Sequence, residues 1–211
     1  MKLFSTVMNE AVYEEVINKS RFIAYIKPVE SKECADEFIS IIKKKHRDAA
    51  HNVPAIVIGD KFNIQWASDD GEPQGTAGAP LVNMLVSRGV TNVVIVVTRY
   101  FGGIKLGTGG LVRAYTKVAQ EAVGEALIAD VISNKAAIIK TDYTFLSKIQ
   151  NIEQEGLFKI IEIKYTDKVN IKISVIEEKF DEIIDILTNI TAGNLYISNI
   201  ENIFIKTPTN T

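Results

Sequence analysis

The sequence is poor in the residues that bind metals and form disulfides. Its 211 residues include one cysteine, Cys34, and two histidines, His46 and His51. A single thiol cannot form an internal disulfide, and it provides no thiol cluster for a metal ion. The histidines stand five residues apart, which does not place both on one helical face in ligand spacing. We therefore expect no metal, no cofactor and no disulfide.

Long apolar runs are also absent. No stretch of eighteen or more apolar residues could span a bilayer, and the 46% apolar and 24% charged residues are ordinary globular proportions. The N-terminus MKLFSTVMNEAVYEE lacks the basic and apolar segments of a secretion signal. We therefore expect a cytoplasmic protein with no membrane contact.

Acidic residues are missing from one long segment. There is no Asp or Glu between Pro73 and Gln120, although the whole chain has a net charge of −2. Most of the chain's glycines lie in this segment, and so do five basic residues: Arg88, Arg99, Lys105, Arg113 and Lys117. This local asymmetry predicts attraction of an anionic partner.

The first part of the chain predicts an α+β domain over residues 1–130. Apolar residues alternate over residues 21–29, as in a half-buried strand. Ser31 is placed to cap a helix over residues 34–45, in which Cys34 shares a face with Phe38 and is expected to be buried. Further elements are predicted at 52–59 and 62–67 (a hairpin), 79–88 (a helix), 92–98 (a strand covered on both faces) and 111–127 (a helix).

The second part of the chain, residues 131–211, predicts a smaller α+β domain. The patterns indicate strands to about residue 144 and at 157–165, 169–176 and 194–206, with helices at about 145–155 and 177–191. The order is therefore βαββαβ, which is the ferredoxin-like pattern.

The acid-free segment contains a candidate RNA- or anion-binding site. We expect Arg99 to follow the end of the buried strand and a glycine loop to open into a helix, so that backbone N–H groups can approach a phosphate. Arg113 and Lys117, four residues apart, would share the polar face of that helix. With Lys105, these cations and the loop glycines form the predicted site: Gly102, Gly103, Gly107, Gly109 and Gly110.

A structural interpretation of the same residues stays open. Glycine clusters also mark tight turns and close packing, and Arg99 can pair with the acidic loop Asp69, Asp70 and Glu72. Nucleotide motifs fail in detail, because Thr108 stands where a Walker lysine belongs. Ser87 and Thr98 lack an identifiable base, so no catalytic residue is predicted.

The acidic loop itself admits two interpretations. Three carboxylates within four residues, Asp69, Asp70 and Glu72, could bind Mg²⁺ or act as acid and base. The loop does not match an EF-hand, and Asp-Asp-Gly and Glu-Pro are strong turn sequences. A solvated turn that neutralises the basic segment is the preferred interpretation.

Two long segments, ASDDGEPQGTAGAP and TNVVIVVTRYFGGIKLGTGGLVRAY, resemble the signature stretches of the YigZ/Impact family. The resemblance is strong over residues 19–127. It implies a ribosomal-protein-S5 domain-2-like N-terminal domain, followed by a ferredoxin-like domain similar to the last domain of elongation factor G. HNVPAIVIGD departs from the family's histidine- and aromatic-rich version near His51.

The resemblance also implies a role linked to translation. The eukaryotic branch restrains an initiation-factor kinase activated by amino-acid starvation, a stress response whose partners are eukaryotic. What carries over is binding to the ribosome, RNA or a translation-associated protein. Two alternatives stay open: an enzyme acting on a phosphorylated or acyl substrate through the carboxylate loop, and an interaction scaffold using the C-terminal sheet. The oligomeric state is open between monomer and homodimer.

Overall fold

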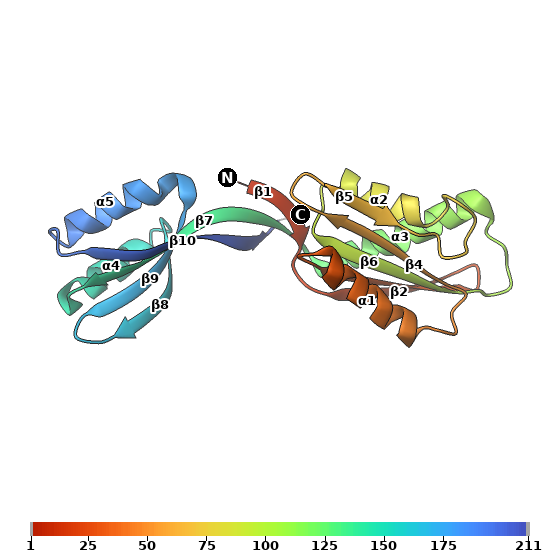
Figure 1. The fold of residues 1–211 in the computed structure, drawn as a ribbon, viewed down its shortest axis with the longest axis horizontal. Helices are drawn as coiled ribbons and strands as arrows, with labels where there is room; N and C mark the ends of the chain where they lie inside the picture. The colour runs from red at the N-terminus through yellow and green to blue at the C-terminus, as the bar shows by residue number, and fades with distance from the viewer. Residues whose placement is uncertain (1, 210–211) are drawn as a thin grey trace. The chain divides into compact units, whose positions relative to one another are not determined.

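The computed structural model describes residues 2–209 and divides them into two compact units (Figure 1). The larger unit contains residues 4–130 and 206–209, and the smaller unit contains residues 2–3 and 131–205. The predicted α+β class with two domains is confirmed. Three strands contribute residues to both units, namely β1 (Lys2–Val7), β7 (Ile128–Thr141) and β10 (Tyr196–Pro208).

The larger unit is built on a five-stranded antiparallel sheet in the order β2-β3-β6-β4-β5. Figure 1 shows α1 on one face of this sheet and α2 and α3 on the other. The elements are β2 (Ala11–Ile17), β3 (Ser20–Pro28), α1 (Lys32–Lys45), β4 (His51–Ile58), β5 (Ile64–Ala67), α2 (Gly78–Ser87), β6 (Val93–Tyr100) and α3 (Gly107–Ala126).

Strand β6 lies at the centre of this sheet and explains the unbroken apolar run in its sequence. Val93, Ile95 and Val97 belong to the core under α2 and α3, whereas Val94 and Val96 belong to the core under α1. Because side chains alternate along a strand and both faces are covered, every position must be apolar. The predicted central strand and the β4–β5 hairpin are confirmed.

Helix α1 has the cap that the sequence predicts, but one residue of its predicted buried face is exposed. The Ser31 hydroxyl accepts a hydrogen bond from the Cys34 backbone N–H, which confirms the cap. The predicted burial of Cys34 is wrong, because its side chain is exposed. The buried stripe follows helical spacing at Ala35, Phe38, Ile39 and Ile42, so Phe38 lies on the buried face and Ala35 is buried in place of Cys34.

The smaller unit has the predicted βαββαβ order. Strand β7 pairs with both β10 and β9, and β9 pairs with β8, while α4 and α5 supply the helical side of the core. The elements after β7 are α4 (Leu146–Glu153), β8 (Lys159–Tyr165), β9 (Val169–Ile176), α5 (Phe180–Ile190) and β10, with 3-10 turns at Tyr143–Phe145 and Glu177–Lys179. No helix within residues 2–209 is both long and apolar enough to cross a membrane.

Candidate anion-binding pocket

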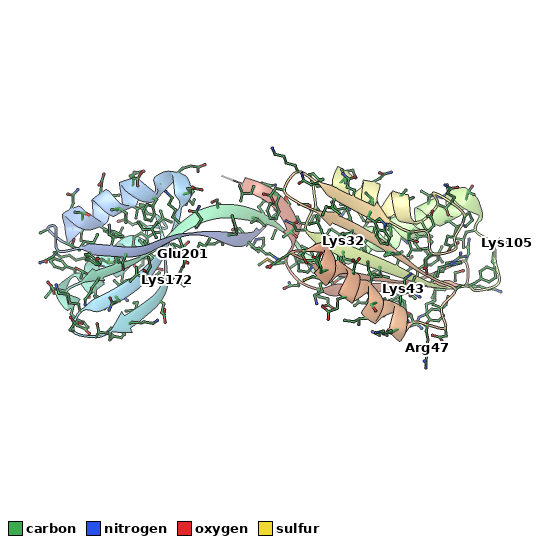
Figure 2. All side chains as sticks on the ribbon, in the orientation of Figure 1. Lys32, Lys43, Arg47, Lys105, Lys172 and Glu201 are labelled. Carbon is green, nitrogen blue, oxygen red and sulfur yellow. The ribbon has the colours of Figure 1, made fainter. Side chains whose placement is uncertain are left out.

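A pocket of about 460 Å³ lies in the larger unit, where the loop after β6 turns into α3. It brings together the two segments that the sequence singles out, the acidic loop and the glycine loop. Figure 2 shows Lys105 on the loop that leads into α3. The lining residues are His51, Gly71, Glu72, Pro73, Arg99, Phe101, Lys105, Leu106, Gly107, Thr108 and Leu111.

The five glycines of the predicted site, of which Gly107, Gly109 and Gly110 lie in α3, differ in whether the fold requires glycine there. A Cβ on Gly102 would lie 1.8 Å from the Lys19 carbonyl oxygen, so close packing requires glycine there. Gly103 and Gly107 have φ values of +87° and +72°, in the left-handed region that favours glycine. These three positions fit the structural interpretation of the glycine cluster.

Gly109 has no such reason. It lies in the first turn of α3 without a positive φ, and a Cβ built on it would meet no atom within 4 Å. Alanine is favoured over glycine in helices, so the fold alone would prefer alanine here. Because glycine has no Cβ, it also leaves room for another molecule to approach the backbone closely at this helix start. Gly110 lies between these two cases, because a Cβ built on it would make a tight contact of 3.0 Å with the Leu106 Cβ.

The N-terminus of α3 leaves its first backbone donors uncapped by a side chain. Leu106 occupies the cap position and makes no side-chain cap hydrogen bond. The first four N–H groups of a helix have no partner within the helix, and the helix dipole adds partial positive charge at this end. With the exposed Lys105 beside it, positive charge gathers at this end of the pocket.

Arg99 lies on the pocket wall but is buried. It lies within β6 rather than after it, which corrects the predicted position, and it is only 5% exposed. Its Nη1 donates to Glu72 Oε1 at 2.7 Å, and its Nη2 donates to the Ser20 hydroxyl at 3.3 Å. The interpretation in which Arg99 pairs with the acidic loop is therefore confirmed for Glu72.

One donor of Arg99 is left without a partner. Its Nε is buried and makes no hydrogen bond within residues 2–209. A buried polar group without a partner is costly, and it suggests that an acceptor is supplied from outside the chain. Because a guanidinium N–H can only donate, the missing partner of Arg99 Nε must be a hydrogen-bond acceptor.

The buried Glu72 carboxylate is held by more than the arginine. The Tyr115 hydroxyl donates to the same Oε1 at 2.8 Å. Burial, and next the neighbouring Glu72 carboxylate, raise the pKa of Tyr115 far above its ordinary value, so the phenol remains a donor. Glu72 Oε1 therefore accepts from two buried donors within one fixed network.

The other two acidic residues hold the loop in place. Asp69 accepts hydrogen bonds from the backbone N–H groups of Gly75, Ala77 and Gly78. Burial alone would raise the pKa of Asp69, but these hydrogen bonds outweigh it and leave the pKa below its ordinary value. Asp70 accepts from the Asn52 N–H and forms an ion pair with Lys43 at 2.6 Å.

His51 is a pocket residue that the sequence interpretation missed. It begins β4 and stands opposite Arg99 in the β4–β6 register, rather than in a loop. Its Nδ1 lies 2.9 Å from the Asp70 carbonyl oxygen, which can only accept, so Nδ1 carries a proton. The other ring nitrogen, Nε2, lies 3.7 Å from Glu72 Oε1. Only the pairing of β4 with β6 reveals this position.

The predicted cations are not all at the pocket. Lys105 lines it, whereas Arg113 and Lys117 are exposed on α3 and do not. Lys117 forms an ion pair with Glu15 of β2, so a countercharge absent from the local sequence is supplied by the fold. Within residues 2–209 no group of three or more His, Cys, Asp or Glu side chains is placed to hold a metal ion.

Two family models and several known proteins match the sequence of this chain. A family model described as the Impact N-terminal domain matches residues 18–123, and one described as a domain of unknown function matches residues 139–194. The IMPACT family member YvyE of Bacillus subtilis is 40% identical over 207 residues, covering 98% of this chain and 95% of that protein. The IMPACT family member YigZ of Escherichia coli is 34% identical over 189 residues, covering 89% and 93%.

A solved structure also matches nearly the whole chain. It is described as the crystal structure of a hypothetical protein, with 32% identity and a TM-score of 0.61, and the match covers 95% of this chain and 98% of that one. The matched architecture is that of a two-domain α+β protein. The chain belongs to the Impact family, and the resemblance seen in its two signature segments is confirmed.

Proposed function

We propose that this chain is a translation-linked binding protein, without catalytic activity of its own, that holds a phosphate group of RNA in the α3 pocket. The observation that carries this proposal is Arg99, a residue that lines the pocket and whose buried Nε has no hydrogen-bond partner within residues 2–209. A phosphate oxygen accepts from a guanidinium N–H, from helix N-terminal N–H groups and from a lysine.

The charges around the pocket support an anionic ligand. Glu72 balances the charge of Arg99, so the attraction comes from Lys105, the α3 dipole and the open backbone N–H groups. Gly107 and Thr108 line the pocket at this first turn without a bulky side chain, and the neighbouring Gly109 is exposed. A phosphate can therefore reach the backbone closely, as it does in other glycine-rich helix starts.

The link to translation rests on family membership. The Impact family relationship supports a translation-associated role, and the ribosome, free RNA and a translation-associated protein are the candidate partners. We commit to RNA, because phosphate is the ligand chemistry that the pocket favours. On the ribosome, RNA phosphates are exposed at high density, so ribosome association would follow from the same contact.

Retention on ribosomes tests the proposal. Lys105→Glu should abolish co-sedimentation with ribosomes at low salt and lower the salt slope of RNA binding by about one unit. Lys61→Glu is the matched control, because Lys61 is also an exposed lysine and lies outside the pocket. Unchanged co-sedimentation of Lys105→Glu would contradict the proposal.

The enzyme alternative predicts a different result. If the acidic loop holds Mg²⁺ for catalysis, Mg²⁺ should raise the thermal stability, and Asp70→Asn should remove that increase. The contacts of Asp69 and Asp70 with backbone N–H groups and Lys43 instead support a structural loop. We therefore expect no Mg²⁺-dependent stabilisation.

The scaffold alternative rests on the C-terminal sheet. Figure 2 labels Lys172 and Glu201 in the smaller unit, and these two side chains form an ion pair at 2.8 Å. Lys164 and Glu162 also pair with each other. Charges that satisfy one another offer little to an incoming partner. This alternative would instead rest on large apolar side chains that are exposed on β8 and β10, namely Ile161, Tyr165, Tyr196, Ile200 and Phe204.

A further inference from the structure

A second hollow in the larger unit lies apart from the α3 pocket. It is an open groove of about 720 Å³ between α1 and the edge of the sheet. No element of the proposed phosphate contact lies in it. Its lining residues are Asp36, Ile39, Ser40, Lys43, Lys44, Arg47, Pro54 and Trp66.

The groove displays the only tryptophan of the chain. Trp66 lies on β5, the edge strand, and stands opposite Ile56 in the register with β4. Because Ile56 packs under α1, Trp66 is on the α1 face of the sheet. It is 43% exposed and belongs to none of the three buried cores. The ring is therefore available on one side to a planar ligand.

Cations gather at the same place. Figure 2 shows Lys43 and Arg47 at the C-terminal end of α1. Lys43 is neutralised by Asp70, but Lys44 and Arg47 are exposed and form no ion pair within residues 2–209. The one acidic lining residue, Asp36, is paired with Lys32. The uncompensated charge of the groove is therefore positive.

We propose that this groove binds single-stranded RNA, with a base stacked on Trp66 and the flanking phosphates on Lys44 and Arg47. An exposed aromatic ring beside unpaired cations is the combination with which proteins hold unpaired strands. A duplex keeps its bases stacked on one another and cannot offer a free base face to the ring. The flat ring thus selects single strands, and the cations select a polyanion.

The acidic loop contacts both surfaces. The Asp70 carboxylate binds Lys43, which lines the groove, and the Asp70 carbonyl oxygen accepts from His51, which lines the α3 pocket. The groove contact is nevertheless separate in its chemistry, because it needs a base and the pocket needs only a phosphate. It goes beyond the proposed function and can fail while the pocket stands.

Intrinsic fluorescence tests the groove directly, since all tryptophan emission comes from Trp66. Adding an unstructured oligouridine at low salt should quench this emission, and an equally long RNA duplex should not. Lys105→Glu should leave the quenching in place, which separates this contact from the pocket. Absence of quenching by the single strand would overturn the proposal.

Variants of the groove residues test which side chains bind the RNA, and polyglutamate tests whether another polyanion binds equally well. Trp66→Ala should weaken binding of a dye-labelled oligouridine roughly 5- to 100-fold, and Trp66→Tyr should restore much of it by keeping a stacking ring. The double variant Lys44→Glu, Arg47→Glu should also weaken binding and reduce its salt dependence. If polyglutamate quenches Trp66 as strongly as oligouridine, the surface binds an acidic protein segment and the RNA proposal is wrong.

Discussion

The variant Gly109→Ala tests whether glycine at this position serves the stability of the fold or the binding of a ligand. A Cβ at this position meets no atom within 4 Å, and the backbone is helical without a positive φ. Replacing glycine by alanine in a helix should therefore raise the free energy of unfolding of the larger unit by about 0.5–1 kcal/mol. The same methyl group would stand at the helix N-terminus where a phosphate approaches.

The binding effect should have the opposite sign. Hydrogen bonds to charged groups are worth about 1.5–3 kcal/mol, so keeping a phosphate away from the α3 N–H groups should weaken RNA binding by about tenfold or more. Gly124→Ala is the matched control. Gly124 lies near the other end of α3, and its Cβ would also meet open space. This variant should gain similar stability and bind RNA normally.

Two assays measure these effects on the same samples. Unfolding in guanidinium chloride, followed by Trp66 emission, reports the larger unit, because the only tryptophan lies there. Fluorescence anisotropy of a dye-labelled RNA reports binding. A Gly109→Ala protein that is more stable and binds RNA as tightly as the parent would refute the argument that this glycine serves a ligand.

Other variants test the network and the loop. Glu72→Ala should cost about 3–5 kcal/mol of unfolding free energy, because it leaves the buried Arg99 without its countercharge; a loss below 1 kcal/mol would show that the pair is not buried as described. Asp69→Asn should cost about 1–2 kcal/mol by weakening a cap of three N–H groups. The pKa of Asp69 is lowered in the fold, so its contribution to the free energy of unfolding is fully present above its ordinary pKa of about 3.9. This contribution is lost as the pH falls through the lowered pKa. In Asp69→Asn, the free energy of unfolding should therefore depend less steeply on pH in this acid range. Cys34 should react with a maleimide in the native protein at a rate close to that in denaturant, and strong native protection would contradict its exposure.

Local patterns predict the elements well where the reason for the element is local. Strand β9 has the predicted bounds, 169–176, because alternation and the flanking turns define it within the segment. Ser31 caps α1 because a hydroxyl at that position needs only the next turn of backbone. The sequence predicts the buried face of α1 correctly at Phe38 but not at Cys34, because a cysteine is apolar enough to fit either side of the stripe.

Long-range pairing decides the site, and local patterns do not contain it. The absence of acids between Pro73 and Gln120 suggests uncompensated cations, but Glu72 and Glu15 reach Arg99 and Lys117 from other strands and loops. His51 joins the pocket only because β4 lies antiparallel to β6. The glycine-rich segment is visible in the sequence, but the predicted helix start at 111 is wrong, because α3 begins at Gly107 and includes Gly109 and Gly110. The walls around this segment depend on the sheet order.

Backbone amide spectra of the isotope-labelled chain, recorded during titration with a short RNA, test the phosphate contact most directly. We expect the amide signals of Gly107, Thr108, Gly109 and Gly110 to shift together and saturably, and Lys105→Glu to weaken this response. Binding of the RNA with these four signals unmoved would contradict it.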